Sequence, residues 1–479
     1  NILSGSETMI IYYILLFLSN ILLSTSYYVK TVLLKTNFFQ LIYYFANGKE
    51  GVGNITSVIE IIKTCLYFFL TSSVITILPI LIIKYFKLLP LKKFIKKYTI
   101  ILLVFSTLLT LKNYQLDKYI YYKLKKTNIY EKYYVDTNKV KVTAPSKKNN
   151  LILIYLESME TSLISKENGG TFTTSRIPEL ETILKENTNF SNTDKFGGPE
   201  NITVASFTMG SLVSSSSATP VDINLFRGYS KKNIPLKNIK TLGDILKENN
   251  YNLKLIQGSP ASFAGTDLYY KEHGNYEIID YNKMKEKKYI DKDYQKWWGV
   301  EDKKLFEIAK KEILKSSESN KPFAVTLFTM DTHFKDGYLD EDCMNKYETN
   351  LSNVYACSSK RVSDFINWIK SNDFYKNTTI VVLGDHLTMQ NSYYNGYKNY
   401  NRTIYNAFIN SKQKEQNNKN RHFNNFDLYP TILASLGFEI EGNKLGFGTN
   451  LYSGEKTLSE KLGSSYVDKE LLKRNQFYD

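Results

Sequence analysis

The sequence predicts an α/β protein in two parts: transmembrane helices at the N-terminus, followed by a domain with a mostly parallel sheet covered by helices on both faces. Two observations support this prediction. Long apolar stretches dominate the first quarter of the 479 residues. Beyond about residue 140, short apolar runs typical of buried strands alternate with helical patterns. Such alternation favours a parallel sheet.

Three stretches are expected to cross a membrane: residues 9–29, 59–83 and 98–111. The third falls short of the roughly 20 residues that a crossing requires, so a buried or interfacial helix is the alternative for it. Between the second and third stretches, residues 84–97 hold six lysines and no acidic residue. The positive-inside rule places this loop in the cytoplasm, and therefore places the chain after the third helix outside it.

We therefore expect three regions along the chain. Residues 1–112 form the transmembrane region, and residues 113–145 form a linker with a Lys- and Tyr-rich helix that lies along the lipid headgroups. Residues 146–479 form the extracytoplasmic domain. The chain begins with Asn, so we expect that a preceding segment is missing.

The strands and helices of the extracytoplasmic domain can be named from their patterns. The predicted strands are the apolar runs "NLILIYLES", "NLKLIQG", "FAVTLFTMDTH" and "TIVVLGDH". The predicted helices are "IPELETILKEN", "TLGDILKENN", "EDKKLFEIAKKEILK" and "SSKRVSDFINWIKSN". The net charge of +15 does not indicate nucleic-acid binding, because no zinc-finger spacing, homeodomain or RNA-binding aromatic motif accompanies it.

The three cysteines fall into two groups. Cys65 lies in an apolar run and is expected to be a small hydrophobic residue of a membrane helix. Cys343 and Cys357 bracket a short loop. In the cytosol they would be unrelated thiols, but in an oxidising compartment they would pair. The topology above therefore predicts a disulfide between them.

Polar side chains follow three of the predicted strands, at the point where each strand ends. They are Glu157 and Ser158, then Asp331, Thr332 and His333, and finally Asp385 and His386. A single pair of this kind can be a helix cap, with Asp in its favoured N-cap position. In open α/β sheets, however, the carboxyl ends of the strands form the binding edge. Acids and imidazoles gathered there can hold a divalent cation of Mn or Zn type, which suits phosphoryl chemistry.

A nucleophile for such chemistry is expected in "GGPENITVASFTMGSLVSSSSATP", which is rich in Gly and hydroxyl side chains. Its helical portion begins near Phe207 and Thr208. A hydroxyl at this point would lie at the positive end of a helix dipole, which stabilises an alkoxide and attracts a phosphate. The alternative is a Ser/Thr-rich cap and turn without a catalytic role.

Together these segments resemble the membrane-bound phosphoglycerol transferases of the alkaline phosphatase and sulfatase superfamily. The resemblance is to the phosphatidylglycerol–membrane-oligosaccharide glycerophosphotransferase type, with lipoteichoic acid synthase as a more distant relative. It covers residues 151–454 and rests on the order and spacing of "IYLESME", "FTMGSLVSSSSATP", "TLGDILKENNYNLKLIQGSPASFAGTDLYYKEHG", "WWGVEDKKLFE", "TLFTMDTHFKDG", "NTTIVVLGDHLTMQN" and "LGFGTNLYSG".

The resemblance implies roles for particular residues. It implies a catalytic Thr208 and one divalent ion held by Glu157, Thr208, Asp385 and His386; the expected ion is Mn²⁺, with Mg²⁺ or Zn²⁺ as alternatives. His333 is similar to the family histidine that contacts the phosphoglycerol headgroup. The further substrate-binding candidates in family-like motifs, each of which could equally be structural, are Asp331, Trp298 and His273.

Two departures from the family pattern affect these assignments. Thr203 competes with Thr208 as nucleophile, because the region carries a short insertion. Thr208 is preferred because its spacing to Pro220 needs no gap. Where relatives carry a basic residue, this chain has Thr266, which leaves the headgroup preference open.

The function implied by the resemblance is transfer of phosphoglycerol from phosphatidylglycerol, through a covalent intermediate on threonine, to a glycan or glycerophosphate acceptor. The enzyme would be a multi-pass protein of the bacterial cytoplasmic membrane with an extracytoplasmic catalytic domain. The alternatives are a phosphoethanolamine transferase, a sulfatase or a membrane-anchored glycan-binding pseudoenzyme. A sulfatase would need Cys or Ser in a Cys/Ser-x-Pro-x-Arg motif, and none surrounds Thr208.

Overall fold

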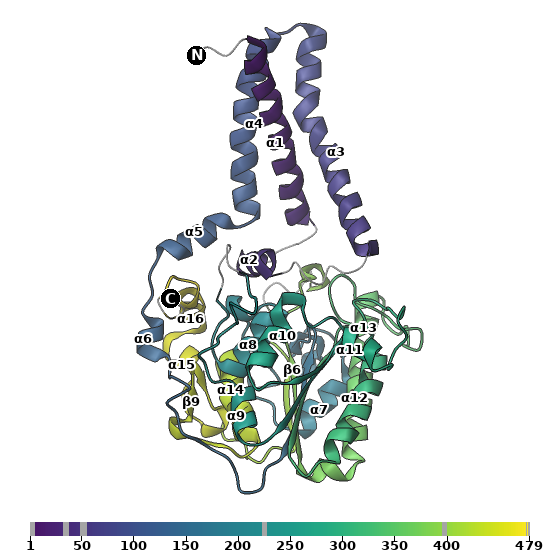
Figure 1. Cartoon of the computed structure of the whole chain (residues 1–479), viewed down its shortest axis with the longest axis vertical. Coiled ribbons are helices and arrows are strands. Elements are labelled where there is room, and N and C mark those ends of the chain that lie inside the picture. Colours follow the sequence, from purple (N-terminus) through teal and green to yellow (C-terminus); the bar gives the residue numbers. More distant parts are fainter. Residues whose placement is uncertain are drawn as a thin grey trace. The chain divides into compact units, whose positions relative to one another are not determined.

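The protein is described by a computed structural model, shown in Figure 1, in which residues 5–31, 38–47, 55–222, 228–394, 400–475 and 477 are described. The chain divides into two compact units. The first comprises Asn1–Leu41 and Val52–Lys125, and the second comprises Ile42–Gly51 and Lys126–Asp479. A short segment that precedes residue 52 thus belongs to the same unit as the α/β domain.

The first unit is helical. Its long helices are α1 (Gly5–Thr31), α3 (Ile55–Phe86) and α4 (Leu91–Asn113), followed by the short α5 (Leu116–Leu124). Portions of the three long helices, Met9–Thr31, Ile62–Phe86 and Leu91–Asn113, are long and apolar enough to cross a membrane. Most of their large side chains are exposed, as lipid-facing residues are.

The third span is longer than the apolar run alone indicates. The sequence predicted residues 98–111, and α4 extends this run by seven residues on its N-terminal side. As a result Lys92, Lys93, Lys96 and Lys97, which were expected in a loop, lie in the first turns of the helix. Lysines at a helix end can extend their ammonium groups toward the membrane surface while their methylenes stay among apolar groups.

Polar contacts join α1 to the other two long helices within this unit. The Asn20 side-chain amide donates to the Ser73 hydroxyl of α3 at 2.7 Å. The Asn113 amide of α4 donates to the Ser26 hydroxyl at 2.7 Å. Paired amides and hydroxyls of this kind hold apolar helices together where the hydrophobic effect does not, because lipid tails are as apolar as the side chains.

The second unit is built on a six-stranded sheet of order β4-β3-β5-β2-β6-β7. All neighbours pair in parallel except β6 and β7. The strands are β2 (Asn150–Leu156), β3 (Asn252–Gln257), β4 (Glu277–Ile279), β5 (Phe323–Phe328), β6 (Thr378–Gly384) and β7 (Asn406–Ile409). The mostly parallel sheet predicted from the sequence is therefore confirmed, and each of its four predicted strands is present.

Helices cover both faces of this sheet (Figure 1). Alternate residues of β2, Ile152 and Ile154, pack in one core with residues from α7 (Pro178–Glu186), α12 (Asp302–Ser317) and α13 (Asn350–Lys370). On the other face the Tyr155 hydroxyl bonds to Ser215 of α8 (Thr208–Ser217) at 2.7 Å. Other α-helices of this unit are the second half of α2 (Phe38–Asn47), α6 (Ile129–Tyr133), α9 (Leu242–Glu248), α10 (Thr266–Glu272), α11 (Tyr281–Glu286), α14 (Asn425–Ser435), α15 (Leu458–Leu462) and α16 (Ser464–Leu471).

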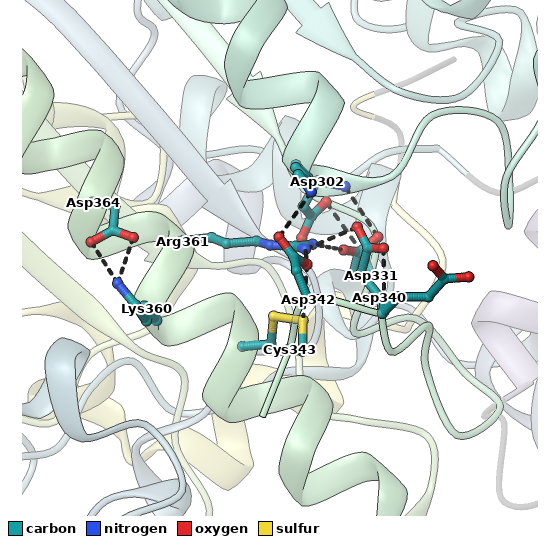
Figure 2. The surroundings of a disulfide bond; sticks show 11 residues. Asp302, Asp331, Asp340, Asp342, Cys343, Lys360, Arg361 and Asp364 are labelled. Carbon is teal, nitrogen blue, oxygen red and sulfur yellow. Dashed lines mark hydrogen bonds and ion pairs between the residues drawn. A yellow bond between two sulfur atoms is a disulfide. The ribbon is translucent and has the colours of Figure 1, made fainter. Parts of the chain in front are cut away.

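A disulfide joins the loop after β5 to helix α13. Cys343 and Cys357 are bonded, with their Cα atoms 5.5 Å apart and a sequence separation of 14. Figure 2 shows this bond beside Arg361 of the same helix, whose guanidinium reaches Asp340 and Asp342 of the loop at 2.9 and 2.6 Å. A covalent bond and an ion-pair cluster thus fix the same loop to α13.

Thiol labelling tests this arrangement. In unreduced, denatured full-length protein, we expect a maleimide to modify Cys65 only, because the other two sulfurs are bonded. In the Cys357→Ala variant, Cys343 becomes free and two thiols should react. Closing so short a loop should contribute roughly 3 kcal/mol to the free energy of unfolding, which a denaturant titration with and without reductant measures. Three labelled thiols in the unreduced wild-type protein would contradict the pairing.

Candidate functional site

The register of two parallel strands brings two carboxylates together. In the β2–β6 ladder, Leu156 lies opposite Gly384. The next residue on each strand is an acid, so Glu157 and Asp385 emerge side by side at the carboxyl edge of the sheet. Both are buried, with exposures of 1% and 0%.

The turn after each strand is shaped to hold these acids. A Cβ at Gly384 would lie 2.0 Å from the carbonyl oxygen of Met159, so only glycine fits directly before Asp385. Ser158 adopts the left-handed conformation, with φ of 51°. In this conformation its amide donates to Asp385 Oδ1 at 2.8 Å, and its hydroxyl donates to Glu157 Oε1 at 2.7 Å. Left-handed backbone in a non-glycine residue is concentrated at functional sites.

His386 completes the cluster from the same turn as Asp385. Its Nδ1 donates to the carbonyl oxygen of Leu387 at 2.9 Å, which leaves the lone pair of Nε2 available. Nε2 lies 3.3 Å from Asp385 Oδ2 and 3.6 Å from Glu157 Oε1. Among the described residues, this is the one group of three acidic, His or Cys side chains whose ligand atoms all lie within 4.8 Å of one another.

The donor set fits a divalent cation. Glu157 Oε2 and Asp385 Oδ2 are buried and have no hydrogen-bond partner within the described part of the chain. An unpaired buried carboxylate oxygen is costly, and a cation removes that cost. Two carboxylates, an imidazole nitrogen and a nearby hydroxyl make a mixed O/N shell suited to Mn²⁺, Mg²⁺ or Zn²⁺.

The electrostatics of the cluster lead to the same conclusion. Burial and the neighbouring charge of Glu157 raise the pKa of Asp385 well above its usual range. Burial lowers the pKa of His386, but the carboxylates of Asp385 and Glu157 outweigh it, and the net shift is upward. The site therefore attracts positive charge, which a proton can supply in part and a metal ion can supply fully.

Thr208 is the hydroxyl that lies at this cluster. It is the first residue of α8, and its Oγ1 is 3.4 Å from His386 Nε2. The first amides of an α-helix have no acceptor within the helix, so they point toward whatever anion binds beside Thr208. The sequence predicted a helix start at this position, and α8 begins there.

Thr203, the competing residue, is held elsewhere. It begins a short 3₁₀ helix, and its hydroxyl donates to Asp468 Oδ2 at 2.9 Å while its amide donates to Asp468 Oδ1 at 2.6 Å. This carboxylate, from α16, thus occupies both donors of Thr203. The geometry supports Thr208 over Thr203 as the nucleophile.

The end of β5 supports Glu157 and carries a half-exposed aromatic pair. The Thr329 hydroxyl accepts from the Glu157 amide at 3.1 Å, and the Thr332 hydroxyl donates to the Glu157 carbonyl at 2.5 Å. The next residue, His333, packs its ring edge-on against Trp298 with centroids 5.0 Å apart. Trp298 is 40% exposed, so this pair can contact a substrate. No role was predicted for the two threonines from the sequence, although "TMDTH" contains both.

Two of the predicted substrate-binding residues form hydrogen bonds to other groups of the protein. Asp331 is buried, and it accepts from the Asp302 amide at 3.1 Å and from Arg361 at 3.1 Å, as Figure 2 shows. Burial and the charge of Asp302 raise the pKa of Asp331. His273 is also buried, and its two ring nitrogens contact Asp244 Oδ2 at 3.0 Å and the Pro235 carbonyl at 2.9 Å.

Comparison with known proteins agrees with this fold. The sequence profile of the sulfatase family matches residues 149–438. Phosphoglycerol transferase I of Citrobacter koseri is 30% identical over 337 residues, which are 68% of this chain and 42% of that protein. Phosphoglycerol transferase I of Escherichia coli is 30% identical over 332 residues, covering 67% of this chain and 41% of the relative.

The chain thus spans about two fifths of the length of these curated relatives. Among solved structures, the integral membrane protein lipooligosaccharide phosphoethanolamine transferase A from Neisseria meningitidis is similar, with 15% identity and a TM-score of 0.52. The similarity covers 91% of this chain and 85% of that one, and it shows a shared fold. Since the family profile matches well over half of the sequence, the chain belongs to the sulfatase family.

Proposed function

We propose that the protein is a metal-dependent phosphoglycerol transferase that uses phosphatidylglycerol as donor and a glycan or glycerophosphate chain as acceptor. The observation that carries this proposal is the position of Thr208. Its hydroxyl lies at the N-terminus of α8 and 3.4 Å from His386 Nε2, in a cluster with two buried carboxylate oxygens that have no hydrogen-bond partner among the described residues. This arrangement joins a nucleophile, an anion site and a cation site at one point.

The ion would be held by Glu157, Asp385, His386 and Thr208. Mn²⁺ is the ion we propose, with Mg²⁺ or Zn²⁺ as alternatives that suit the same donors. When bound, such an ion lowers the pKa of a hydroxyl and neutralises phosphate oxygens. The protein's own part is to hold these side chains in place, through the Ser158 amide and hydroxyl and through the two threonines after β5.

The reaction proceeds in two displacements at phosphorus. In the first, Thr208 Oγ1 loses its proton and forms a bond to phosphorus, while the bond from phosphorus to the diacylglycerol oxygen breaks and that oxygen takes up a proton. In the second, an acceptor hydroxyl forms the new ester bond and the bond to Thr208 breaks, which regenerates the threonine. The free amides of α8 bind the phosphate oxygens throughout.

The names of the relatives support this choice of headgroup, since two proteins 30% identical to this chain are phosphoglycerol transferases. Three helices able to span a membrane support a location in the bacterial cytoplasmic membrane, near a lipid donor. The disulfide after β5 supports an extracytoplasmic, oxidising location for the catalytic domain.

The alternatives differ in the group transferred. A phosphoethanolamine transferase would leave phosphoethanolamine on the same threonine, and a sulfatase would act on sulfate esters. A glycan-binding pseudoenzyme would form no adduct, although its cluster of buried acids would then have no chemical purpose. The mass of a trapped adduct distinguishes all of these.

The first prediction concerns the metal. The Asp385→Asn and Glu157→Gln variants should bind Mn²⁺ at least ~100-fold more weakly than the wild-type protein, because each removes a charged ligand. Circular dichroism should be unchanged, since both residues lie at strand ends. Asp364→Asn is the matched control, as Asp364 is exposed and, among the described residues, forms an ion pair with Lys360 alone. Elemental analysis of the purified proteins measures the occupancy, and full occupancy in Asp385→Asn and Glu157→Gln would contradict the metal assignment.

The second prediction concerns pH. The pKa of Asp385 and that of His386 are both raised, so each keeps its proton to higher pH than an ordinary Asp or His. A metal must displace these protons, and its apparent affinity should therefore rise steadily with pH between about 5 and 8. Calorimetric titration of the metal-free protein with Mn²⁺ in this range measures the slope. An affinity independent of pH would show that these groups do not bind the ion.

The third prediction concerns the nucleophile. Full-length protein incubated with phosphatidylglycerol vesicles, quenched and digested, should carry phosphoglycerol on Thr208. Thr208→Ala should abolish the adduct and lower turnover by ~10³-fold or more, because it removes a nucleophile. Thr203→Ala is the control and should retain both, since the Thr203 hydroxyl is bonded to Asp468. An adduct that persists in Thr208→Ala would transfer the role to another hydroxyl.

A further inference from the structure

Helix α2 (Phe38–Asn47) contributes its second half to the catalytic unit, although it precedes two of the three candidate membrane spans in sequence. Tyr43 is completely buried there, and its hydroxyl donates to the carbonyl oxygen of Ala264 at 2.6 Å. The Asn47 side-chain oxygen accepts from the Tyr229 amide at 2.6 Å. A Cβ at Gly228 would lie 2.3 Å from the Ala46 carbonyl oxygen, so the two backbones are in close contact.

This docking places two aromatic rings against the residue that precedes the proposed nucleophile. The Tyr43 and Tyr44 rings contact Phe207 with centroids 4.9 and 5.9 Å apart. Phe207 is the N-cap of α8, directly before Thr208. The Tyr44 ring also stacks on Phe263, at 5.7 Å with 24° between the planes. Tyr44 is therefore fixed on two sides by rings of the catalytic domain.

The two tyrosines differ in what their hydroxyls do. The Tyr43 hydroxyl is occupied by Ala264, whereas the Tyr44 hydroxyl makes no hydrogen bond to any residue that the structure describes. Tyr44 keeps some solvent exposure. Burial, and then the charges of Glu157 and Asp385, raise the pKa of the Tyr44 phenol. The Tyr44 phenol therefore keeps its proton, and no residue that the structure describes accepts a hydrogen bond from it.

We propose that Tyr44 is a substrate-contacting residue of this active site, whose hydroxyl donates a hydrogen bond to a non-bridging oxygen of the phosphodiester. The proposal rests on the proposed function, because the phosphate must be the group that Thr208 attacks. Its physical basis is the position of a free donor beside the N-cap of α8, where the helix amides bind the other phosphate oxygens. A segment that precedes residue 52 would therefore complete the site of the α/β domain.

The test compares two phenol-to-phenyl changes one residue apart in the full-length protein in phosphatidylglycerol vesicles. Tyr44→Phe keeps the ring contacts with Phe207 and Phe263 and removes the free donor. It should lower kcat/KM for phosphatidylglycerol by about 10- to 100-fold, the range for a hydrogen bond to a charged group. It should also weaken inhibition by inorganic phosphate, with unchanged metal content. Tyr43→Phe is the matched control: it should lower the unfolding temperature but leave both kinetic measurements near wild type.

Several outcomes would overturn the proposal. Equal activity in Tyr44→Phe and the wild-type protein would show that the hydroxyl does not contact the phosphate. An equal loss in Tyr43→Phe and Tyr44→Phe would indicate docking of the segment rather than a contact by one hydroxyl. Loss of metal in Tyr44→Phe would indicate an effect through the cation. The failure of the proposed function is distinct, because the wild-type protein would then form no phosphoglycerol adduct on Thr208, and the role of Tyr44 would fall with it.

Discussion

The pairing of β2 with β6 is the constraint on which the rest of the site depends. It sets Leu156 against Gly384 and so forces Glu157 and Asp385 into one buried place. Two buried carboxylates repel each other, and each costs several kcal/mol to remove from water. Backbone and side-chain donors from Ser158 satisfy one oxygen of each acid, and the other oxygens have no hydrogen-bond partner among the residues that the structure describes. A bound cation, as proposed above, would balance this arrangement.

A second group of buried acids in the same domain has a cation that the protein itself supplies. Asp302, the first residue of α12, lies beside Asp331, which follows β5, and burial raises the pKa of both. There the protein supplies the cation itself, since Arg361 reaches Asp331 at 3.1 Å (Figure 2). At Glu157 and Asp385 no Lys or Arg ion pair is present among the described residues, and His386 alone faces the acids. The two clusters therefore differ in the cation beside the acids: Arg361 lies beside Asp331, whereas Glu157 and Asp385 have no Lys or Arg ion pair among the described residues, which supports the proposed metal at Glu157 and Asp385.

The sequence predicted the features that depend on local pattern. The strands were found because each is a continuous apolar run. Glu157, Asp385 and His386 were found because they follow such runs. The disulfide was predicted from topology, and the structure contains the same pair. Asp331 and His273 show the limit of this reasoning, because a motif gives the position of a residue but not its partner. The structure shows both to be buried and hydrogen-bonded to protein groups.

The contribution of α2 could not be predicted for a different reason. Its sequence, "FFQLIYYFAN", contains no acid, base or histidine, and its tyrosines suit a membrane interface equally well. What matters there is a contact between residues more than 160 positions apart, Tyr43 and Phe207, and no local pattern encodes it. Long-range packing of this kind becomes visible only once the whole unit is folded.

The residues at the candidate metal cluster follow local sequence motifs, whereas the aromatic residues of α2 come from a distant segment. This separation has a chemical consequence. Under the proposed function, the acids, His386 and Thr208 would activate a phosphodiester, but they would not distinguish an acceptor hydroxyl from water, since both attack the same phosphorus. That choice would depend on other surfaces of the domain, such as the half-exposed ring pair of Trp298 and His333 and the aromatic group of Tyr44, Phe207 and Phe263. A shared fold can hold one metal cluster and still serve different donors and acceptors, because specificity lies in such surrounding groups. In this chain part of that surrounding comes from α2, so the features that would favour transfer over hydrolysis are not confined to the α/β sequence.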